Sequence, residues 1–576
     1  SAMLDAMSHR GELRSTKHVH TVTLAAQSHL KTSSVTRDGV HVVIDGEIHN
    51  RVELECSADL DAATVVLQSY QRWGPEAIDR LVGDFAIILY DEHARSLLAA
   101  RDALGMRPLY FHRDGEKVKF ASESQALVAA GVGNHPHLLA SALFMTFDFK
   151  EQGHTLRDQI EALPPGHRLI VNARGVDLQP FWKPNPWKKL DIDEREAASL
   201  FADTFREAVR CRTPQNGKLG VILSGGLDSS SIACQAAALN TKPTALHCSL
   251  TGWECDETSV GRAVSQKWAL PWIAIAGDGS EMSGATRPHT RHPDQLYQAW
   301  SACFDALFAR AKSEGIETVM TGLGGDQMVD ENGAECVDAL REGSLREVVT
   351  ITGIDRHPLS IQAYRRLFQG IKGVVPARLR FATRQLRPRH QPMFLTPDWT
   401  KEVHEHVDSH RRDQLDTPWP DRSSAAMCAM LEQHGIRISA ANTNLVGTLH
   451  GLNVTHPFLD RRVFELALAI PRRHRLRRGW RKRKPVLRRA MAELLPEAVA
   501  DRRDAAEFSC YLRDVYLRAH RSEVANLLSE SRLADLGIIN VDKVRSAFDA
   551  GLSSPSHLIH FGMVLSMELW LRQDWS

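Results

Sequence analysis

Apolar strand patterns alternate with helix patterns between residues 193 and 320. Alternation of this kind is typical of a doubly wound parallel sheet, because each helix returns the chain to the same end of the sheet. The remaining sequence predicts helices with long polar connections. We therefore expect an α/β domain with a helical extension over residues 186–576. Its predicted elements are a helix at 193–209, strands at 219–223, 244–250, 272–276 and 317–320, and helices at 230–238, 258–268 and up to residue 313.

The first part of the chain has a different pattern. Short β-type runs at 41–44, 85–90 and 118–121 are separated by turn residues, and a helix pattern lies at 62–70. A Pro-rich and Trp-rich stretch at 180–187 is typical of a linker. We therefore predict a sheet-rich α+β domain over residues 1–185. A chain of 576 residues is expected to hold at least two cores.

Composition argues against several classes of protein. Lysine plus arginine (71) nearly equals aspartate plus glutamate (70), which argues against nucleic acid or membrane as the main partner. No stretch reaches the roughly 18 apolar residues of a membrane helix, and the start has no signal pattern. The nine cysteines form no CxxC pair, which indicates reduced thiols rather than a disulfide framework or zinc site. We expect a cytoplasmic protein.

The sharpest local signal is a glycine- and serine-rich loop between the strand at 219–223 and the next helix. Its two glycines let the backbone approach a ligand closely, and its hydroxyls and helix-start N–H groups form an anion-binding nest. The loop lacks the Gly-Lys-Ser/Thr of a Walker A motif, and no GxGxxG follows a strand. We predict a phosphate site with Asp228 as a magnesium ligand. The predicted binding residues are Ser224, Gly225, Gly226, Leu227, Asp228, Ser229 and Ser230.

This loop resembles that of the asparagine-synthetase-like branch of the ATP pyrophosphatases, which have an adenine nucleotide α-hydrolase-like fold. The string 321–326 resembles the family's second glycine loop, whose aspartate, here Asp326, binds Mg²⁺-pyrophosphate. The strand at 245–250 lies where the family holds adenine, and 456–460 and 484–491 resemble late family blocks. The resemblance implies ATP contacts for His247, Cys248, Ser249, Leu250, Gly322, Leu323, Gly324 and Gly325.

The resemblance also implies a reaction. A carboxylate is a poor acyl donor, so ATP converts it to an acyl-adenylate while pyrophosphate leaves, and cations must meet the growing charge. Asp228 and Asp326 are expected to hold Mg²⁺. Lys484 and the basic run at 472–482 are candidate cations, although a solvated charged face is equally expected of such a run. The catalytic block of the family falls at Arg503, Asp504 and Ala505, where Ala505 stands at the position of the family lysine.

Three motifs before residue 130 resemble an N-terminal-nucleophile (Ntn) glutamine amidotransferase sandwich. They are Ser8-His9-Arg10-Gly11, Asp45-Gly46-Glu47-Ile48-His49-Asn50, and Gly83-Asp84-Phe85-Ala86 with the run 101–110. A working glutaminase uses an N-terminal cysteine as nucleophile and that residue's own amine as base. That cysteine and its strand are absent, Asp45 replaces the asparagine of the NGE motif, and Gln27 replaces an arginine. We expect a degenerate scaffold that makes no ammonia.

Without ammonia from this domain, the amine must come from elsewhere. Relatives with a silent glutaminase domain are the β-lactam synthetases and the lasso-peptide isopeptide cyclases, in which the substrate's own amine attacks the adenylate. The TGxGGD form of the second loop, the basic segment 344–390 and the block 502–509 favour the cyclases. The resemblance implies a precursor (core) peptide as substrate, with a leader peptidase and a leader-recognition protein as partners.

Other functions stay open. A β-lactam-type or other small-molecule amide synthetase and an asparagine synthetase use the same chemistry. A catalytically inactive binding homologue is motivated by Leu323, which neither accepts nor donates a proton where relatives have Glu or Tyr, and by Ala505. In an active enzyme, a neighbouring cation such as Arg503 or Lys484 would have to replace the lysine.

Overall fold

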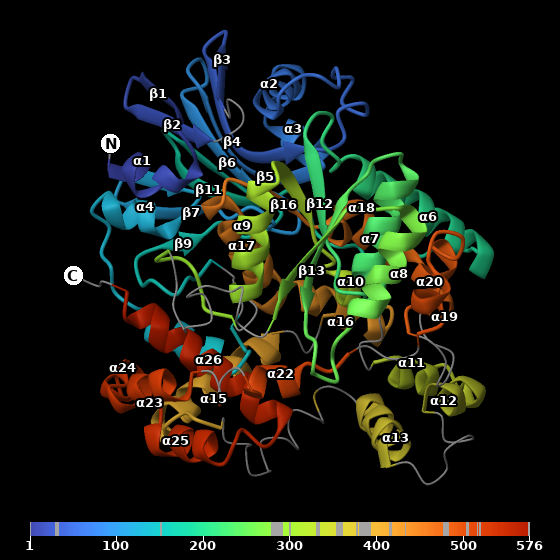
Figure 1. The fold of residues 1–576 in the computed structure, drawn as a ribbon. Coiled ribbons are helices and arrows are strands. Elements are labelled where there is room, and N and C mark those ends of the chain that lie inside the picture. Colours follow the sequence, from blue (N-terminus) through green and yellow to red (C-terminus); the bar gives the residue numbers. More distant parts are fainter. Residues whose placement is uncertain are drawn as a thin grey trace.

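A computed structural model gives the fold in Figure 1. It describes residues 2–28, 34–149, 153–277, 292–298, 301–329, 334–352, 361–375, 378, 393–413, 417–432, 434–475, 483–502, 506–514, 517 and 520–573.

A five-stranded parallel sheet forms the centre of the later part of the chain, in the order β14-β13-β12-β15-β16. One face packs against α6, α7, α8, α18 and α20, and the other against α9 and α17. The predicted doubly wound sheet is therefore confirmed. The strands are β12 (Lys218–Ile222), β13 (Thr244–Ser249), β14 (Trp272–Ala276), β15 (Ile316–Met320) and β16 (Asn453–Thr455). The helices are α6 (Glu194–Arg210), α7 (Leu227–Ala238), α8 (Thr258–Trp268), α9 (Ser301–Ser313), α17 (His434–Leu449), α18 (Arg461–Ala469) and α20 (Pro485–Ala490).

Local sequence explains how α6 is placed. Asp193 and Glu196 form a reciprocal capping box at its start, and Phe201 and Phe205 are buried on the face that meets the sheet. The opposite, polar face carries ion pairs such as Arg206–Asp203 at 2.7 Å.

The first part of the chain is a sandwich of antiparallel sheets. Six strands run in the order β11-β10-β6-β5-β4-β3, and a three-stranded sheet, β8-β7-β9, packs on one face of β5 and β6. Helix α2 (Ala62–Trp73) covers the opposite face. Strand bounds are β1 (Leu13–Val19), β2 (Val22–Ser28), β3 (Ser34–Arg37), β4 (Val40–Ile48), β5 (Gly83–Asp91), β6 (Ser96–Arg101), β7 (Tyr110–Asp114), β8 (Lys117–Ala121), β9 (Glu161–Ala162), β10 (His167–Asn172) and β11 (Gly175–Pro180).

The predicted linker follows β11 and has no regular structure between residues 181 and 193. Trp182 anchors it, since the side chain is 9% exposed and its Nε1 donates to Glu465 Oε1 at 2.7 Å. A boundary at 185/186 stays a prediction.

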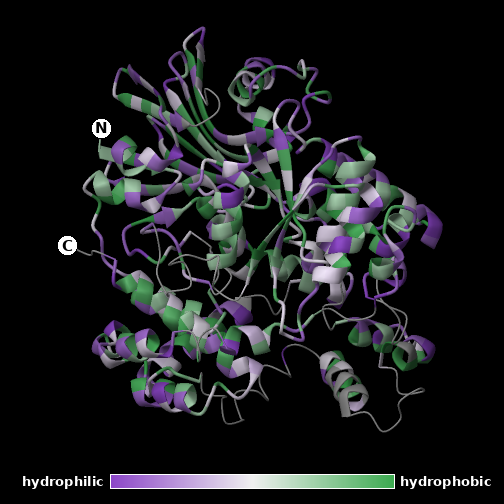
Figure 2. Cartoon of the chain, viewed as in Figure 1, coloured by the Kyte–Doolittle hydropathy of each residue, from purple (hydrophilic) through white to green (hydrophobic). Residues whose placement is uncertain are grey.

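Helices form the last part of the chain. Helices α15 and α23 to α26 share a core with α5, and Figure 2 shows much of α26 in the hydrophobic colour. No helix among the described residues is long and apolar enough to cross a membrane. The remaining helices are α1 (Ala2–Ala6), η1 (Ser8–Arg10), η2 (Gly74–Glu76), α3 (Ala77–Arg80), α4 (Ser124–Ala129), α5 (Leu138–Met145), α10 (Gly325–Val329), α11 (Glu335–Arg341), α12 (Leu345–Thr352), α13 (Ile361–Val374), α15 (Pro397–Asp413), α16 (Arg422–Glu432), η3 (Pro457–Leu459), α19 (Arg472–Arg475), α21 (Glu497–Ala500), α22 (Ser509–Asp514), α23 (Arg521–Ser529), α24 (Arg532–Asp535), α25 (Val541–Asp549) and α26 (Pro555–Leu571).

Candidate active site

Two glycine-rich loops meet where the strand order reverses. One follows β12 and the other follows β15, and these strands are neighbours in the sheet. From this point the chain runs to β13 and β14 on one side and to β16 on the other. The crevice at such a switch point is where open α/β sheets bind ligands. Both predicted loops therefore lie at the expected place.

Glycine is required at both loops because other groups approach closely. Gly225 has φ +101°, and a Cβ there would lie 2.8 Å from the carbonyl oxygen of Glu257. Gly324 has φ +98° and faces Leu459. A Cβ on Gly325 would lie 2.3 Å from Cγ of Asp228, so the second loop packs directly on the acidic side chain of the first.

Lys484 joins the two loops. Its Nζ lies 2.5 Å from Asp228 Oδ2 and 2.7 Å from Asp326 Oδ1, although the side chain comes from a third segment. The residue is 5% exposed, with φ +56° immediately before Pro485 of α20. Burial lowers the pKa of Lys484, but the two carboxylates outweigh that effect and the pKa is raised. For Asp326, burial raises the pKa, and Lys484 reverses the shift and lowers it.

The two aspartates fit a magnesium ion. Their carboxylate oxygens come from separate loops and converge on one ammonium group, and Mg²⁺ prefers oxygen ligands. Asp326 keeps 63% of its side chain exposed, which leaves room for water or phosphate oxygens in the coordination shell.

The serine hydroxyls have different surroundings. Ser224 is exposed and its Oγ accepts from the N–H of Gly226 at 3.2 Å and lies 3.0 Å from Ser229 Oγ. Leu227 starts helix α7, with Gly226 as its N-cap. Ser230 is fully buried in α7. The exposed Ser224 is thus better placed for a phosphate than Ser230 is.

The predicted adenine strand holds its side chains away from a ligand. His247 is 2% exposed, with Nδ1 2.7 Å from the Leu223 carbonyl oxygen and Nε2 2.9 Å from Thr258 Oγ1, and burial lowers its pKa. Cys248 Sγ faces Cys303 Sγ at 3.3 Å. Ser249 Oγ lies 3.0 Å from Thr258 Oγ1, and the Leu250 N–H donates to Asp256. The side chains of His247, Cys248 and Ser249 are engaged with other parts of the protein, so an adenine contact by this strand would use backbone groups.

Leu323 belongs to the packing of the second loop. It is half-buried against the large core beside the sheet, and its N–H donates to Thr321 Oγ1 at 3.3 Å. Thr321 in turn pairs with His456 at 2.7 Å, and burial lowers the pKa of His456 to about 3. A Cβ placed on Gly322 would lie 3.0 Å from the backbone nitrogen of Ser229, so this glycine is also closely packed.

The predicted catalytic block Arg503, Asp504 and Ala505 lies outside the described residues. The residue before it, Arg502, stood out in the sequence only as the first residue of the block 502–509. Arg502 pairs with Glu257, and its Nη1 lies 3.4 Å from the carbonyl oxygen of Gly225. Because Gly225 belongs to the phosphate loop, the block begins beside the switch point.

The basic run before Lys484 has a structural role where it is described. Arg472 binds Glu342 and Glu347 at 2.6 and 2.9 Å. Arg475 is 1% exposed, and its Nη1 donates to the carbonyl oxygen of Ala467 at 3.1 Å. These arginines are engaged away from the phosphate loop, and the rest of the run, 476–482, lies outside the described residues.

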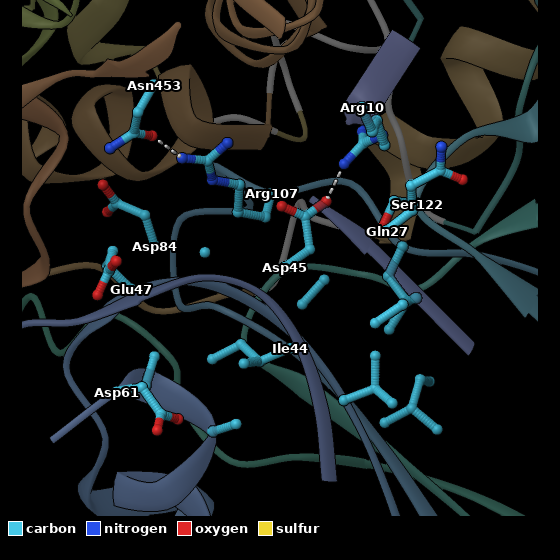
Figure 3. Close-up of a pocket in the computed structure, with 18 of the residues that line it drawn as sticks. Arg10, Gln27, Ile44, Asp45, Glu47, Asp61, Asp84, Arg107, Ser122 and Asn453 are labelled. Atoms are coloured by element: carbon cyan, nitrogen blue, oxygen red, sulfur yellow. Dashed lines mark hydrogen bonds and ion pairs between the residues drawn. The ribbon is translucent and has the colours of Figure 1, made fainter. Parts of the chain in front are cut away.

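A second cavity, of about 1160 Å³, lies in the first part of the chain against the central sheet (Figure 3). Arg10 and Asp45 face each other there at 2.5 Å. Burial raises the pKa of Asp45, but Arg10 and Arg107 outweigh it and the pKa is lowered. Gln27 donates to the carbonyl oxygen of Gly11 at 2.6 Å, and Arg107 donates to Asn453 at 2.8 Å. Arg10 and Asp45 are therefore paired with each other, whereas Arg107 Nε and Gln27 Oε1 are buried without a hydrogen-bond partner among the described residues.

Three further residues near this cavity resemble a metal site in composition. His9, Glu123 and His292 place ligand-type atoms within 4.8 Å of one another. However, Arg10 also binds Glu123, and Nδ1 of His292 accepts from the Asp294 N–H at 3.1 Å. That bond leaves the ring proton on Nε2, which faces Glu123 at 3.2 Å and has no lone pair for a metal. The cluster is an ion-pair network.

The motifs of the first part also meet the later part through a residue that the sequence did not single out. Arg212 is buried and binds Asp84 at 2.8 Å and Asp460 at 2.6 Å. Asp84 belongs to the Gly-Asp-Phe-Ala motif and Asp460 to the late block. In the run 101–110, the Asp102 carboxylate accepts from the N–H groups of Met106 and Arg107. These motifs therefore stabilise the fold and the contact between the two parts.

Two converging aspartates, a buried lysine and a glycine-rich helix start at the switch point of a doubly wound sheet are typical of enzymes that bind the phosphates of a nucleotide. Comparison with known proteins narrows the class. The profile described as Asparagine synthase matches residues 200–572, and that described as Glutamine amidotransferase domain matches residues 1–182. The chain belongs to the asparagine synthase family, with an Ntn glutamine amidotransferase-like domain in front. Family members are ATP-dependent ligases that adenylate a carboxylate, release AMP and pyrophosphate, and form an amide bond.

Individual relatives are distant. Amidase chry2 of Gibberella zeae is 22% identical over 573 residues, covering 90% of this chain and 84% of the relative. Asparagine synthetase [glutamine-hydrolyzing] 1 of Bacillus subtilis is 22% identical over 522 residues, covering 85% and 79%. Among solved structures, glutamine PRPP amidotransferase from B. subtilis has 12% identity and a TM-score of 0.24, covering 56% of this chain and 78% of that one.

Proposed function

We propose that this chain forms an isopeptide bond within a peptide, as in lasso-peptide macrocyclisation. It would adenylate the side-chain carboxylate of an Asp or Glu, and the peptide's own N-terminal amine would attack the adenylate. The observation that carries the proposal is a contrast between two sites. Charges converge on the exposed side of the switch point, whereas the charged residues of the cavity in the first part, Arg10 and Asp45, are bound to each other.

The first chemical step needs positive charge. A carboxylate oxygen of the substrate attacks the α-phosphorus of ATP, and the bond to pyrophosphate breaks. Lys484 can neutralise the leaving group from its position between the loops, and the N–H groups at the start of α7 bind phosphate oxygens. Mg²⁺ held by Asp228 and Asp326 would add Lewis-acid charge stabilisation.

The second step forms the amide. The amine nitrogen attacks the acyl carbon, AMP leaves with the bonding electron pair, and the nitrogen loses a proton. Leu323 cannot accept that proton, because its side chain is apolar and packs in the core. The proton acceptor therefore has to be another group, such as AMP itself or a residue from the segment that contains 503–505.

Two residues of the cavity bear on where the amine that attacks the adenylate comes from. Asp45 stands where the family motif has asparagine and is bound to Arg10, and Gln27 is bound to Gly11 instead of being a cation for a glutamine carboxylate. These features favour an amine carried by the substrate over ammonia from glutamine. They also favour a small-molecule amide synthetase over an asparagine synthetase if the substrate is not a peptide.

The substrate implies partners. A peptide made with a leader has a free N-terminal amine at its core only after the leader is cut. We propose a leader peptidase and a leader-recognition protein as partners, with the core peptide as substrate and the cytoplasm as the site of action.

Mass spectrometry of the products tests the proposal. The chain is incubated with ATP, Mg²⁺ and a candidate core peptide, in parallel with the same peptide acetylated at its N-terminus. The proposal predicts AMP and loss of one water from the free peptide, with no water loss from the acetylated one. AMP with a β-amino acid alone would instead support a β-lactam-type synthetase, and AMP with aspartate and ammonia an asparagine synthetase. ATP binding without AMP from any substrate would support an inactive binding homologue.

A further inference from the structure

Helix α13 (Ile361–Val374) carries an exposed apolar stripe. Tyr364, Phe368 and Ile371 are 53%, 57% and 52% exposed, and Val375 just after the helix is 39% exposed. The spacing of these residues is four, three and four. At about 100° per residue, this spacing keeps Tyr364, Phe368 and Ile371 on one narrow side of the helix, and Val375 follows at the next interval of four. Scattered surface apolar residues are ordinary, but a continuous seam of this kind is not.

The opposite side of α13 is fixed against α11. Gly370 and Gly373 contact α11 so closely that a larger residue would not fit. A Cβ on Gly370 would lie 2.4 Å from Cys336 Sγ, and a Cβ on Gly373 would lie 2.3 Å from Val337 Cγ2. The two glycines lie roughly half a helical turn from the stripe. Figure 1 shows α13 at the edge of the molecule beyond α11 and α12, away from the central sheet. The seam therefore points outward because the glycines hold the other face.

The seam has a basic flank. Lys372 is exposed, and its Nζ lies 4.3 Å from the ring centroid of Phe368. The other flank is apolar, with Val374, which is 39% exposed, and Leu367, which packs against the core formed by α11 and α12. Among the described acidic residues of α11, α12 and their connection, Glu342 and Glu347 are bound to Arg472, and Glu335 and Asp338 are buried. The charge beside the seam is thus positive.

We propose that α13 is a docking site for an amphipathic helix of a second protein, one with an apolar seam and an acidic flank. A four-three-four seam is the pattern of helix-on-helix packing, and flanking charges select the partner. A second copy of this chain would place Lys372 opposite Leu367 and Val374 in a parallel pair, or opposite another Lys372 in an antiparallel pair, and neither supplies an acid. A membrane surface would favour a broader apolar face than this narrow seam.

The proposal is independent of the proposed chemistry, because α13 carries none of the site residues. It is tested with a dye-labelled designed peptide of three heptads that has leucine at the seam positions and glutamate at the flanks. A second peptide with lysine flanks is the matched probe. Fluorescence anisotropy with the full chain is expected to show binding of the glutamate-flanked peptide only. Phe368→Glu and Ile371→Glu should each weaken binding at least about tenfold, since each buries a charge in the seam.

Two further variants sharpen the test. Ile559→Glu changes a residue of similar exposure, 48%, on another helix, and should leave binding unchanged. Lys372→Glu should transfer preference to the lysine-flanked peptide. The proposal is overturned if the glutamate-flanked peptide does not bind, or binds Phe368→Glu equally well. It is also overturned if sedimentation shows a dimer of the chain that Phe368→Glu abolishes, or if phosphatidylserine vesicles alone bind through the seam.

Discussion

The switch point of the central sheet and the cavity of the sandwich both hold carboxylates beside cationic side chains, but the groups are paired differently at the two sites. At the switch point, two carboxylates from separate loops share one buried lysine, and Asp326 remains 63% exposed. In the cavity, Arg10 is bound by Asp45 and by Glu123, and Arg107 by Asn453. The first arrangement can exchange a protein partner for a phosphate or a metal. In the second, two carboxylates hold Arg10, while Arg107 is bound only to a neutral amide and its Nε has no partner among the described residues.

The sequence predicts that this family architecture has kept one site and lost the other. The sandwich still packs, because its motifs bind structural partners such as Arg212. Its cavity is therefore part of the fold, and the sequence predicts that the groups within it do not bind glutamine. Ligand-binding capacity then has to be judged from how charges are paired rather than from the presence of a cavity.

The largest expected effect is at the switch point. Asp228→Asn removes a carboxylate that faces the second loop and the proposed metal. We expect ATP–pyrophosphate exchange to fall by about 10²–10³-fold, as for loss of one charge-stabilising group. Asp203→Asn, an exposed aspartate on α6, is the control and should leave exchange unchanged. Equal rates for the two variants would place adenylation elsewhere.

A stability test comes next, at the cavity's edge. Arg212→Met removes the buried cation that Asp84 and Asp460 share and leaves Asp460 with Arg462 alone, which should cost about 3–5 kcal/mol. Burial raises the pKa values of Asp84 and Asp460, but Arg212 outweighs it and both are lowered. These carboxylates therefore stabilise the fold fully above about pH 4, the pKa of aspartate in the unfolded chain. The stabilisation is lost as pH falls toward their lower pKa values in the folded protein.

Denaturant unfolding at several pH values measures this effect. The difference in free energy of unfolding between the wild type and Arg212→Met should be largest at pH 7 and smaller at pH 3. Arg210→Met is the matched control, since Arg210 is more than half exposed and its pair with Glu207 contributes less than about 1 kcal/mol. A variant as stable as wild type at pH 7 would contradict a structural role for the cavity's charges.

A smaller effect is expected from the contact between the loops. Gly325→Ala places a Cβ against Asp228 and should displace that carboxylate without removing it. We expect exchange to fall about 10–100-fold, the range for a misplaced catalytic group. Gly435→Ala has open space around its Cβ and serves as the control. Activity in Gly325→Ala equal to that of the control would show that the position of Asp228 does not matter.

The smallest effect is expected in the cavity. Asp45→Asn restores the asparagine of the family motif, and ATP–pyrophosphate exchange should stay at the wild-type rate because this side chain binds only local groups. Glutamate release from glutamine should remain undetectable. A gain of glutamine hydrolysis would show instead that the cavity can still bind and hydrolyse glutamine.

Much of the fold could be predicted because its elements carry strong local patterns. The helices and strands from 193 to 320 were predicted within a few residues, since buried parallel strands and amphipathic helices repeat regularly. The strand at 41–44 was predicted too short. Strand β4 continues through Asp45, Gly46 and Glu47, where polar residues hide the alternation although the backbone pairs with β5.

The site was predictable where glycine and serine spacing fixes a loop, and less so where distant residues meet. Lys484 was proposed as a cation, and its contact with both aspartates became visible only in the structure. Arg212 gave no local signal, and Arg502 stood out only as the first residue of the block 502–509, because their partners lie more than 100 residues away. Leu323 looked like a lost catalytic residue in sequence, while packing gives it a structural role.

Oxygen tracing tests the central claim, adenylation of a peptide carboxylate, most directly. A candidate core peptide with ¹⁸O in its acceptor carboxylate is incubated with the chain, ATP and Mg²⁺, without glutamine or ammonia. Attack of the carboxylate on the α-phosphorus must carry one labelled oxygen into AMP when the isopeptide bond forms. We predict labelled AMP together with a peptide lighter by one labelled water. Cyclised peptide with unlabelled AMP would contradict the account.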